Sequence, residues 1–246
     1  GQCIFCKRTK EDTATFKEKA HTIPESLGSS NIGVDICDDC NHYFGKAPKA
    51  RTPAIDLAFK EVFNAFKTFG RNLTVDTYKH FRSVFFEYRH SRHTIRIKNN
   101  FDSRSVTTQF KRGLYEVFLQ KYHVLTGKGN NPMFDAVRSY ARYGYGHLHV
   151  FYAYNNIIFE PKETDLLKLP MSSSILDNMM SSGIFEFWLS GHMFFLEVLP
   201  VAFESRGQAY LQRAAQKILI PAKGNERIFE FTDISQIDIF MQRLYS

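Results

Sequence analysis

The sequences CIFC at Cys3–Cys6 and CDDCNHYFG at Cys37–Gly45 decide how this chain folds. They contain all four cysteines of the protein, and two residues separate the cysteines within each pair. Sulfur atoms three positions apart in a tight turn converge on one point, so two such pairs supply four ligands to one metal ion. No basic segment followed by an apolar one marks a secretory leader, and we expect a cytoplasmic protein without disulfides.

The four cysteines predict a structural Zn²⁺ site made of Cys3, Cys6, Cys37 and Cys40. Four sulfur ligands close the coordination shell and leave no position for water, which is typical of a structural zinc. The 30 residues between the pairs exceed the usual spacing of a zinc ribbon, so we expect a folded segment between them. Strands are expected at 13–19 and 34–36, and a helix over 39–46.

The segment between the pairs reads HTIPESLG at His21–Gly28, and Asn41 and Gly45 follow the second pair. This order of cysteines, His, Pro, Gly and Asn over residues 3–45 resembles the zinc-containing HNH endonucleases. The resemblance implies a ββα-metal unit braced by the zinc, with His21 as the general base. It also implies that Asn41 binds a catalytic divalent cation, Mg²⁺ or Mn²⁺.

Two positions depart from the family pattern. Ala20 stands where the family usually places a metal ligand before the base, and Gly45 cannot replace a third His found in some branches. The residues that offer a substitute ligand are Glu18, Glu25, Asp38, Asp39 and His42. A structural alternative stays open for both principal residues, because His21 could support the zinc fold or bind phosphate and Asn41 could cap the helix.

The positive charge of the chain lies after the zinc-binding segment. The net charge is +7, but residues 1–45 hold five Lys/Arg and seven Asp/Glu, a net of −2, which leaves +9 for the remainder. A hairpin is expected from strands at 84–88 and 94–98. Its basic residues are the candidates for phosphate contact, the alternative being an ordinary solvated face. They are Arg89, Arg92, His93, Arg96 and Lys98.

The rest of the chain predicts an α+β fold, in which a larger domain of helices and antiparallel hairpins follows the zinc unit. Helices are expected at 54–69, 106–125, 132–143 and 207–219, strands at 147–154 and 227–232, and a hairpin over 184–198. His147 and His149 would share one face of their strand, where they can bind a metal ion only with a third ligand nearby. We expect an HNH module at 1–46, a linker at 47–53 and a domain of unknown family at 54–246.

These features favour a metal-dependent endonuclease that hydrolyses phosphodiester bonds in double-stranded DNA. Proteins that resemble it are often bacterial or phage-encoded and linked to defence against foreign DNA. No apolar stretch is long enough for a membrane span, and a homo-oligomer or a regulatory protein partner is compatible with the sequence. The alternatives are a catalytically degenerate, zinc-stabilised nucleic-acid-binding module and an interaction protein in which the zinc unit only scaffolds.

Overall fold

The computed structural model of the protein describes residues 1–21, 32–69, 81–92, 94–154, 167–168, 171–189 and 191–239. At His21, Ile32, Leu167 and Lys168 it describes the backbone alone. His93 of the expected basic patch therefore lies outside the described residues, as do residues 22–31 of the HNH-like segment and Ser190 of the expected hairpin turn.

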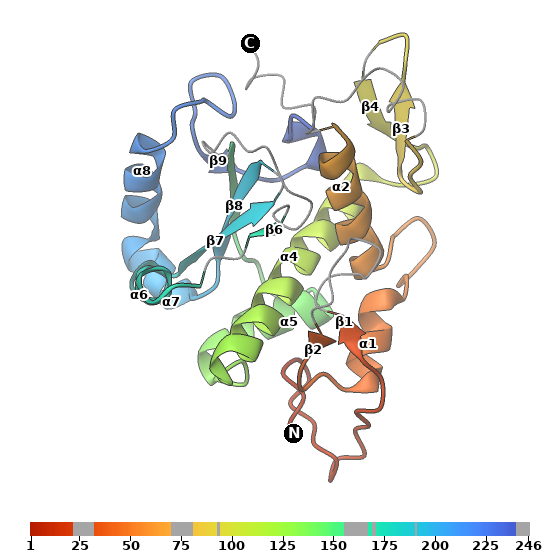
Figure 1. The fold of residues 1–246 in the computed structure, drawn as a ribbon, viewed down its shortest axis with the longest axis vertical. Coiled ribbons are helices and arrows are strands. Elements are labelled where there is room, and N and C mark those ends of the chain that lie inside the picture. The colour runs from red at the N-terminus through yellow and green to blue at the C-terminus, as the bar shows by residue number, and fades with distance from the viewer. Residues whose placement is uncertain are drawn as a thin grey trace.

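The N-terminal part is a small unit of two strands and one helix (Figure 1). Strand β1 (Ala20–His21) pairs antiparallel with β2 (Ile32–Gly33), and helix α1 (Asp38–Gly45) follows. The helix expected at 39–46 is confirmed, but both strand predictions were wrong. At 13–19, the backbone N–H groups of Lys17 and Glu18 donate to the Asp38 carboxylate and not to a neighbouring strand. At 34–36, Asp35 adopts a positive φ of 56°, so the extended backbone of β2 does not continue through this segment.

Two long helices form the middle of the molecule. Helix α2 (Ile55–Phe69) packs on the central helix α4 (Ser103–Thr126), and α5 (Asp135–Tyr143) packs on α4 after a short 3₁₀ turn, η2 (Pro132–Phe134). The Asp102 side chain caps α4 by accepting from the backbone N–H of Ser105, and Gly127 ends it in the left-handed conformation. Between α2 and α4 the chain forms a hairpin of β3 (Phe86–Arg89) and β4 (Thr94–Ile97).

A five-stranded antiparallel sheet lies beside α4, with the strand order β6-β7-β8-β5-β9. Its strands are β5 (Val150–Tyr154), β6 (Leu167–Lys168), β7 (Ile184–Leu189), β8 (His192–Glu197) and β9 (Phe229–Glu230). One face packs on α2 and α4 through rings such as Phe110 and Phe194. The other face, which includes Phe151, packs against residues of the C-terminal helices such as Phe203 and Leu211.

The C-terminal helices cover the side of the sheet that faces away from α4 (Figure 1). They are α7 (Pro200–Ala202), a π-helical turn η4 (Phe203–Gly207) and α8 (Gln208–Gln216). Helix α6 (Ser173–Ser182) packs on β7 and joins the α4-side core through Met179, and a last 3₁₀ turn, η5 (Ile234–Gln236), packs on α4. The predicted mixture of helices and antiparallel strands behind an N-terminal cysteine cluster is confirmed. No helix among the described residues is long and apolar enough to cross a membrane.

One hydrophobic core extends from the N-terminal unit into the rest of the chain. Phe44 of α1, Phe59 of α2 and Phe118 of α4 all belong to the same cluster of buried residues. Gly33 of β2 lies so close to α4 that an added Cβ would stand 2.7 Å from the Gln120 side-chain oxygen. The division into domains at residues 46 and 54 stays a prediction, but the two parts are packed together without a gap between their cores.

Candidate metal centre and active site

The four cysteines meet at one point between the N-terminal knuckle and α1. Their sulfur atoms all lie within 4.8 Å of one another, and the Sγ atoms of Cys6 and Cys37 are 3.6 Å apart. Cys3, Cys37 and Cys40 are fully buried. Zn–S bonds of 2.3 Å in a tetrahedron place sulfur atoms about 3.8 Å apart, so this cluster fits a structural zinc.

Local backbone structure holds the sulfurs in place. Cys37 is the N-cap of α1 and Cys40 lies in its first turn, so their side chains converge. The first pair sits in a tight turn in which the backbone N–H of Lys7 donates to the carbonyl of Cys3, and Lys7 has a positive φ of 61°. The backbone N–H of Cys37 also donates to the Cys3 sulfur at 3.4 Å, which ties the two knuckles together.

Two arginines compensate the negative charge of the sulfurs. The Nε of Arg8 lies 3.5 Å from the Cys6 Sγ, and the Nε of Arg142 on α5 lies 3.4 Å from the Cys40 Sγ. The Arg142 guanidinium also rests 3.4 Å from the centre of the Tyr43 ring on α1. A zinc ion with four thiolates carries a net charge of −2, so these two cations are the outer shell that such a site needs.

The ionisation of the sulfurs is unequal. Hydrogen bonds with Cys3 and Cys40 lower the pKa of the Cys6 thiol, and Arg8 lowers it further. Contacts with Cys3 and Cys6 raise the pKa of Cys40 well above its ordinary value. A divalent cation binds thiolates and displaces their protons, so a bound ion allows all four adjacent sulfurs to be ionised together.

A second cluster of polar side chains lies at the exposed side of α1. The Asn41 Nδ2 donates to the Glu18 Oε2 at 3.1 Å, and the His42 Nε2 lies 2.9 Å from the other oxygen of the same carboxylate. Glu18 precedes β1, the strand that ends in His21. Asn41 and His42 are adjacent positions on α1, and one carboxylate reaches both.

The other carboxylates that the sequence offers as substitute ligands bind other groups or lie outside the described residues. Asp38 binds the backbone of Lys17 and Glu18, and its pKa is lowered, first by the Thr15 hydroxyl and then by these amides. Asp39 forms an ion pair with Arg8 at 2.6 Å. Glu25 lies outside the described residues. Glu18 is therefore the described carboxylate that stands next to Asn41.

A cavity of about 760 Å³ adjoins this cluster. It lies between the zinc unit, the segment 47–54, α2 and α4, and Asn41 and Gly45 form part of its lining. Its basic lining residues are Lys19, Lys49, Arg51 and Lys60. Four cations around one opening favour the entry of a polyanion.

Two carboxyl groups line the same cavity. Asp56 of α2 lies beside Gly45, where an added Cβ would stand 3.7 Å from the Asp56 Oδ2. Burial raises the pKa of Asp56 to about 6. The pKa of the neighbouring Glu116 on α4 is raised well above its ordinary value, by burial first and then by the charge of Asp56. No sequence signal linked these two residues, which come from different helices.

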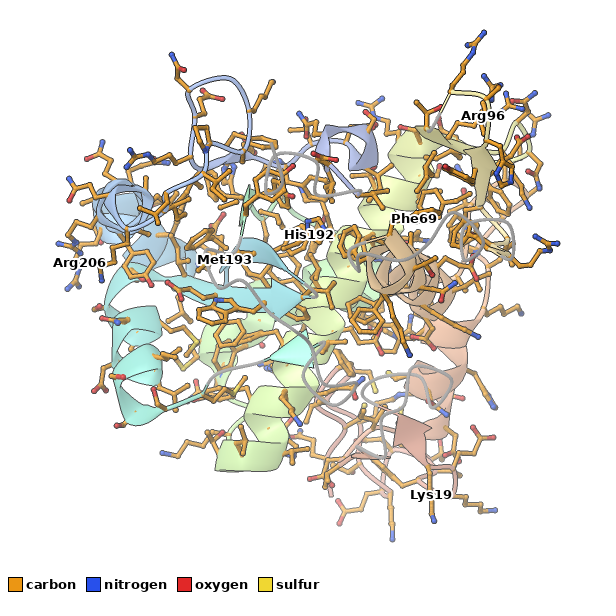
Figure 2. The ribbon with its side chains drawn as sticks, turned by 45° about the horizontal axis from the view of Figure 1, so that its top comes forward. Lys19, Phe69, Arg96, His192, Met193 and Arg206 are labelled. Carbon is orange, nitrogen blue, oxygen red and sulfur yellow. The ribbon has the colours of Figure 1, made fainter. Side chains whose placement is uncertain are left out.

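Two side chains of the expected basic patch bind groups within the protein, and two others lie at the turn of the hairpin. Arg96 binds Glu87 across the hairpin, with its NH2 group 2.8 Å from the carboxylate, and the Lys98 Nζ donates to the carbonyl of Ser83 at 2.6 Å. Arg92 is exposed at the turn, and Arg89 ends β3. Lys19 and Arg96 lie at opposite ends of the molecule (Figure 2).

Fold and metal centre thus define a small ββα unit braced by four cysteines. Residues 3–52, which contain this unit, match the family model described as HNH endonuclease, and this match confirms the resemblance seen in the sequence. The matched segment contains the four cysteines, His21 and Asn41. No curated protein and no solved structure matches the chain.

Proposed function

We propose that this protein is a metal-dependent endonuclease that hydrolyses phosphodiester bonds in double-stranded DNA. One observation carries the proposal: within the HNH-like segment, the carboxylate of Glu18, which lies two residues before the strand that ends in His21, contacts Asn41. Carboxylate and amide oxygens are the ligands that Mg²⁺ accepts, and Mg²⁺ keeps several waters, so two protein ligands suffice. Glu18 thus supplies the ligand that Ala20 lacks.

In this proposal His21 is the general base. Its neutral imidazole takes a proton from a water molecule, the water oxygen attacks the phosphorus, and the bond to the 3′ oxygen breaks. The departing oxygen then takes up a proton from solvent. A divalent cation held by Asn41 and Glu18 would supply charge stabilisation at the scissile phosphate.

The cavity beside Asn41 supports a nucleic acid as the substrate. Four basic residues are part of its lining, and neutralising phosphate charges with lysine and arginine is a main source of affinity for DNA. Arg89 and Arg92 of the hairpin are proposed as further phosphate contacts. A role in defence is a proposal that rests on the resemblance alone. A cytoplasmic location is proposed as well, and so is a partner that restrains the nuclease, because an unrestrained nuclease would be toxic.

The test is incubation of the purified protein with supercoiled plasmid, with Mg²⁺ or Mn²⁺ and with no added divalent cation. We expect metal-dependent nicking or linearisation that His21→Ala abolishes, while the variant keeps its zinc and its affinity for DNA. Normal cleavage by the variant would refute the role of His21.

The alternative function is a zinc-stabilised module that binds nucleic acid without cutting it. Ala20 favours this alternative, because its buried methyl group cannot bind a metal ion. Salt-sensitive DNA binding without cleavage in Mg²⁺, Mn²⁺ or Ni²⁺ would support it.

A further inference from the structure

A second group of metal-binding side chains lies outside the HNH-like segment, at the end of the sheet. His147, His149 and Glu230 each offer a ligand atom, and these atoms all lie within 4.8 Å of one another. The His149 Nδ1 is 2.8 Å from the Glu230 Oε1, and the two imidazole rings are 4.6 Å apart between centroids. The third ligand that the pair of histidines lacked in the sequence thus comes from β9, 81 residues after His149.

The backbone of His149 is fixed from both sides. Its N–H donates to the Glu197 carboxylate at 2.8 Å, and its carbonyl accepts from the Tyr115 hydroxyl at 2.8 Å. Glu197 and Tyr115 are both buried. These hydrogen bonds fix the backbone position from which the His149 ring extends, and a metal ligand requires such a fixed support.

The ring of His149 is also stacked on aromatic neighbours. It lies nearly parallel to Phe203, at 5.5 Å and 27°, and to Phe151, at 6.0 Å and 22°. Phe203 begins the π-helical turn η4, and its ring occupies the space above Gly207, where an added Cβ would come within 2.2 Å of it. Gly207 therefore permits the ring position that supports His149. Single π-helical turns are often found at functional sites.

The charges around this cluster favour a cation. Glu230 and Glu197 bring two carboxyl groups close to His149, and the buried Lys111 of α4 is the opposing positive group near Glu230. Both histidines remain accessible, His147 being exposed and the side chain of His149 38% exposed. An ion from solvent can therefore reach the site without any opening of the fold.

The donor set decides which ions fit. Two imidazoles and one carboxylate suit Zn²⁺ and the similar ions Co²⁺ and Ni²⁺, whereas Mg²⁺ prefers an all-oxygen shell. Three protein ligands leave at least one coordination position for water or for a group on another molecule. Glu230 and Phe151 also line a neighbouring cavity of about 410 Å³, so such a group has space beside the site.

We propose that His147, His149 and Glu230 form a second metal site, which binds an exchangeable divalent transition-metal ion of the zinc class. This site is separate from the cysteine centre and does not depend on the nuclease proposal. Three ligands at the surface predict faster exchange than at the buried four-cysteine site.

The experiment is a Co²⁺ titration of the full, zinc-loaded chain, followed by equilibrium dialysis and metal analysis. We expect one Co²⁺ per chain in addition to the retained zinc, with weak visible bands and no sulfur-to-cobalt absorption in the near ultraviolet. His147→Asn and Glu230→Gln should each remove this equivalent and leave the zinc in place. If the wild-type chain binds zinc at its cysteines but no second ion, the proposal is wrong.

Two matched variants locate the site. His90→Asn removes another exposed histidine, from the β3–β4 turn, and should leave the second equivalent intact. Glu18→Gln tests whether the ion binds at the candidate nuclease site instead. Loss of Co²⁺ in Glu18→Gln but not in His147→Asn would overturn the assignment, as would its loss in His90→Asn alone. Circular dichroism spectra that match the wild type show that each variant is folded.

Discussion

At the scale of single residues, the candidate active site depends on a carboxylate that the sequence pattern did not single out. Glu18 contacts both Asn41 and His42, and it is partly exposed toward solvent. If Glu18 binds the catalytic cation, Glu18→Gln keeps the size and the hydrogen-bonding capacity of the side chain but removes its charge. We expect cleavage with Mg²⁺ to fall by about 100-fold, equivalent to ~2.7 kcal/mol of transition-state stabilisation. Plasmid nicking rates at several Mg²⁺ concentrations measure this effect.

Asp39→Asn is the matched control for Glu18→Gln. Asp39 also lies beside α1, but its carboxylate pairs with Arg8 at the surface, away from Asn41. Surface pairs of this kind contribute about 0–1 kcal/mol to stability, so the variant should remain folded. Equal loss of cleavage in both variants would mean that Glu18 has no specific role.

A second prediction at this scale concerns the pH dependence of stability. Burial raises the pKa of Asp56 from 3.8 to about 6, so the folded protein binds this proton more tightly than the unfolded chain does. The associated stability is present below about pH 4 and is lost as the pH rises toward 6. Because one pKa unit corresponds to ~1.4 kcal/mol, the loss amounts to about 3 kcal/mol.

Asp56→Asn removes this titration. Relative to the wild type, the variant should gain up to about 3 kcal/mol in free energy of unfolding between pH 4 and pH 6. Urea denaturation at a series of pH values, without added Mg²⁺, measures it. A difference between variant and wild type that does not change with pH would contradict the assignment.

At the scale of elements, α5 contacts the four-cysteine centre from outside the segment that carries the cysteines. Arg142 donates to the Cys40 sulfur and covers the Tyr43 ring of α1. Removing an outer-shell partner of a metal ligand typically weakens metal binding by about 10- to 100-fold. We therefore expect Arg142→Ala to release zinc correspondingly faster to a chromophoric chelator. Arg104→Ala replaces an exposed arginine on α4 and should release zinc like the wild type. Equal release rates for the wild type, Arg142→Ala and Arg104→Ala would rule out a role of Arg142 in holding the metal.

The sequence was most informative where local patterns determine structure. The helices expected at 54–69 and 106–125 occur as α2 and α4, and the hairpin at 184–198 as β7 and β8, because apolar spacing and glycine punctuation act over a few residues. Helix α6 was not predicted, and the helical segment expected from 207 begins earlier, at Pro200, and contains a π-helical turn at Phe203–Gly207. A π-helical turn depends on the packing of Phe203 over Gly207, which residue spacing does not reveal.

The candidate sites were predictable to different degrees. The cysteine cluster followed from spacing alone, since each pair lies within one turn of chain. The contact of Arg142 with Cys40 joins residues 102 positions apart, and Asp56 meets Glu116 across two helices. Such pairs depend on how the helices pack, and no local pattern in one sequence encodes that. His21 and Asn41 stay predictions as catalytic residues.

At the scale of the whole molecule, the continuous core predicts that zinc stabilises the entire chain. Phe44 and the buried cysteines belong to the same core as α2 and α4, so loss of the ion exposes apolar surface in both parts. Structural zinc sites contribute on the order of 10 kcal/mol to folding. We expect EDTA to lower the Tm in one cooperative transition, recorded by calorimetry and restored by added Zn²⁺. Two transitions, with the second unchanged by EDTA, would instead show an independent C-terminal domain.

The close approach of Gly33 to Gln120 has a consequence for how the gene of such a protein can recombine. An N-terminal unit whose inner surface is shaped by a neighbouring helix cannot be exchanged freely between genes. A recombination event that joined it to a different C-terminal region would leave β2 without α4 and α1 without α2 and α5, and the exposed apolar surface would promote aggregation. The two parts of this chain are therefore expected to have changed together, substitution by substitution, on either side of their contact.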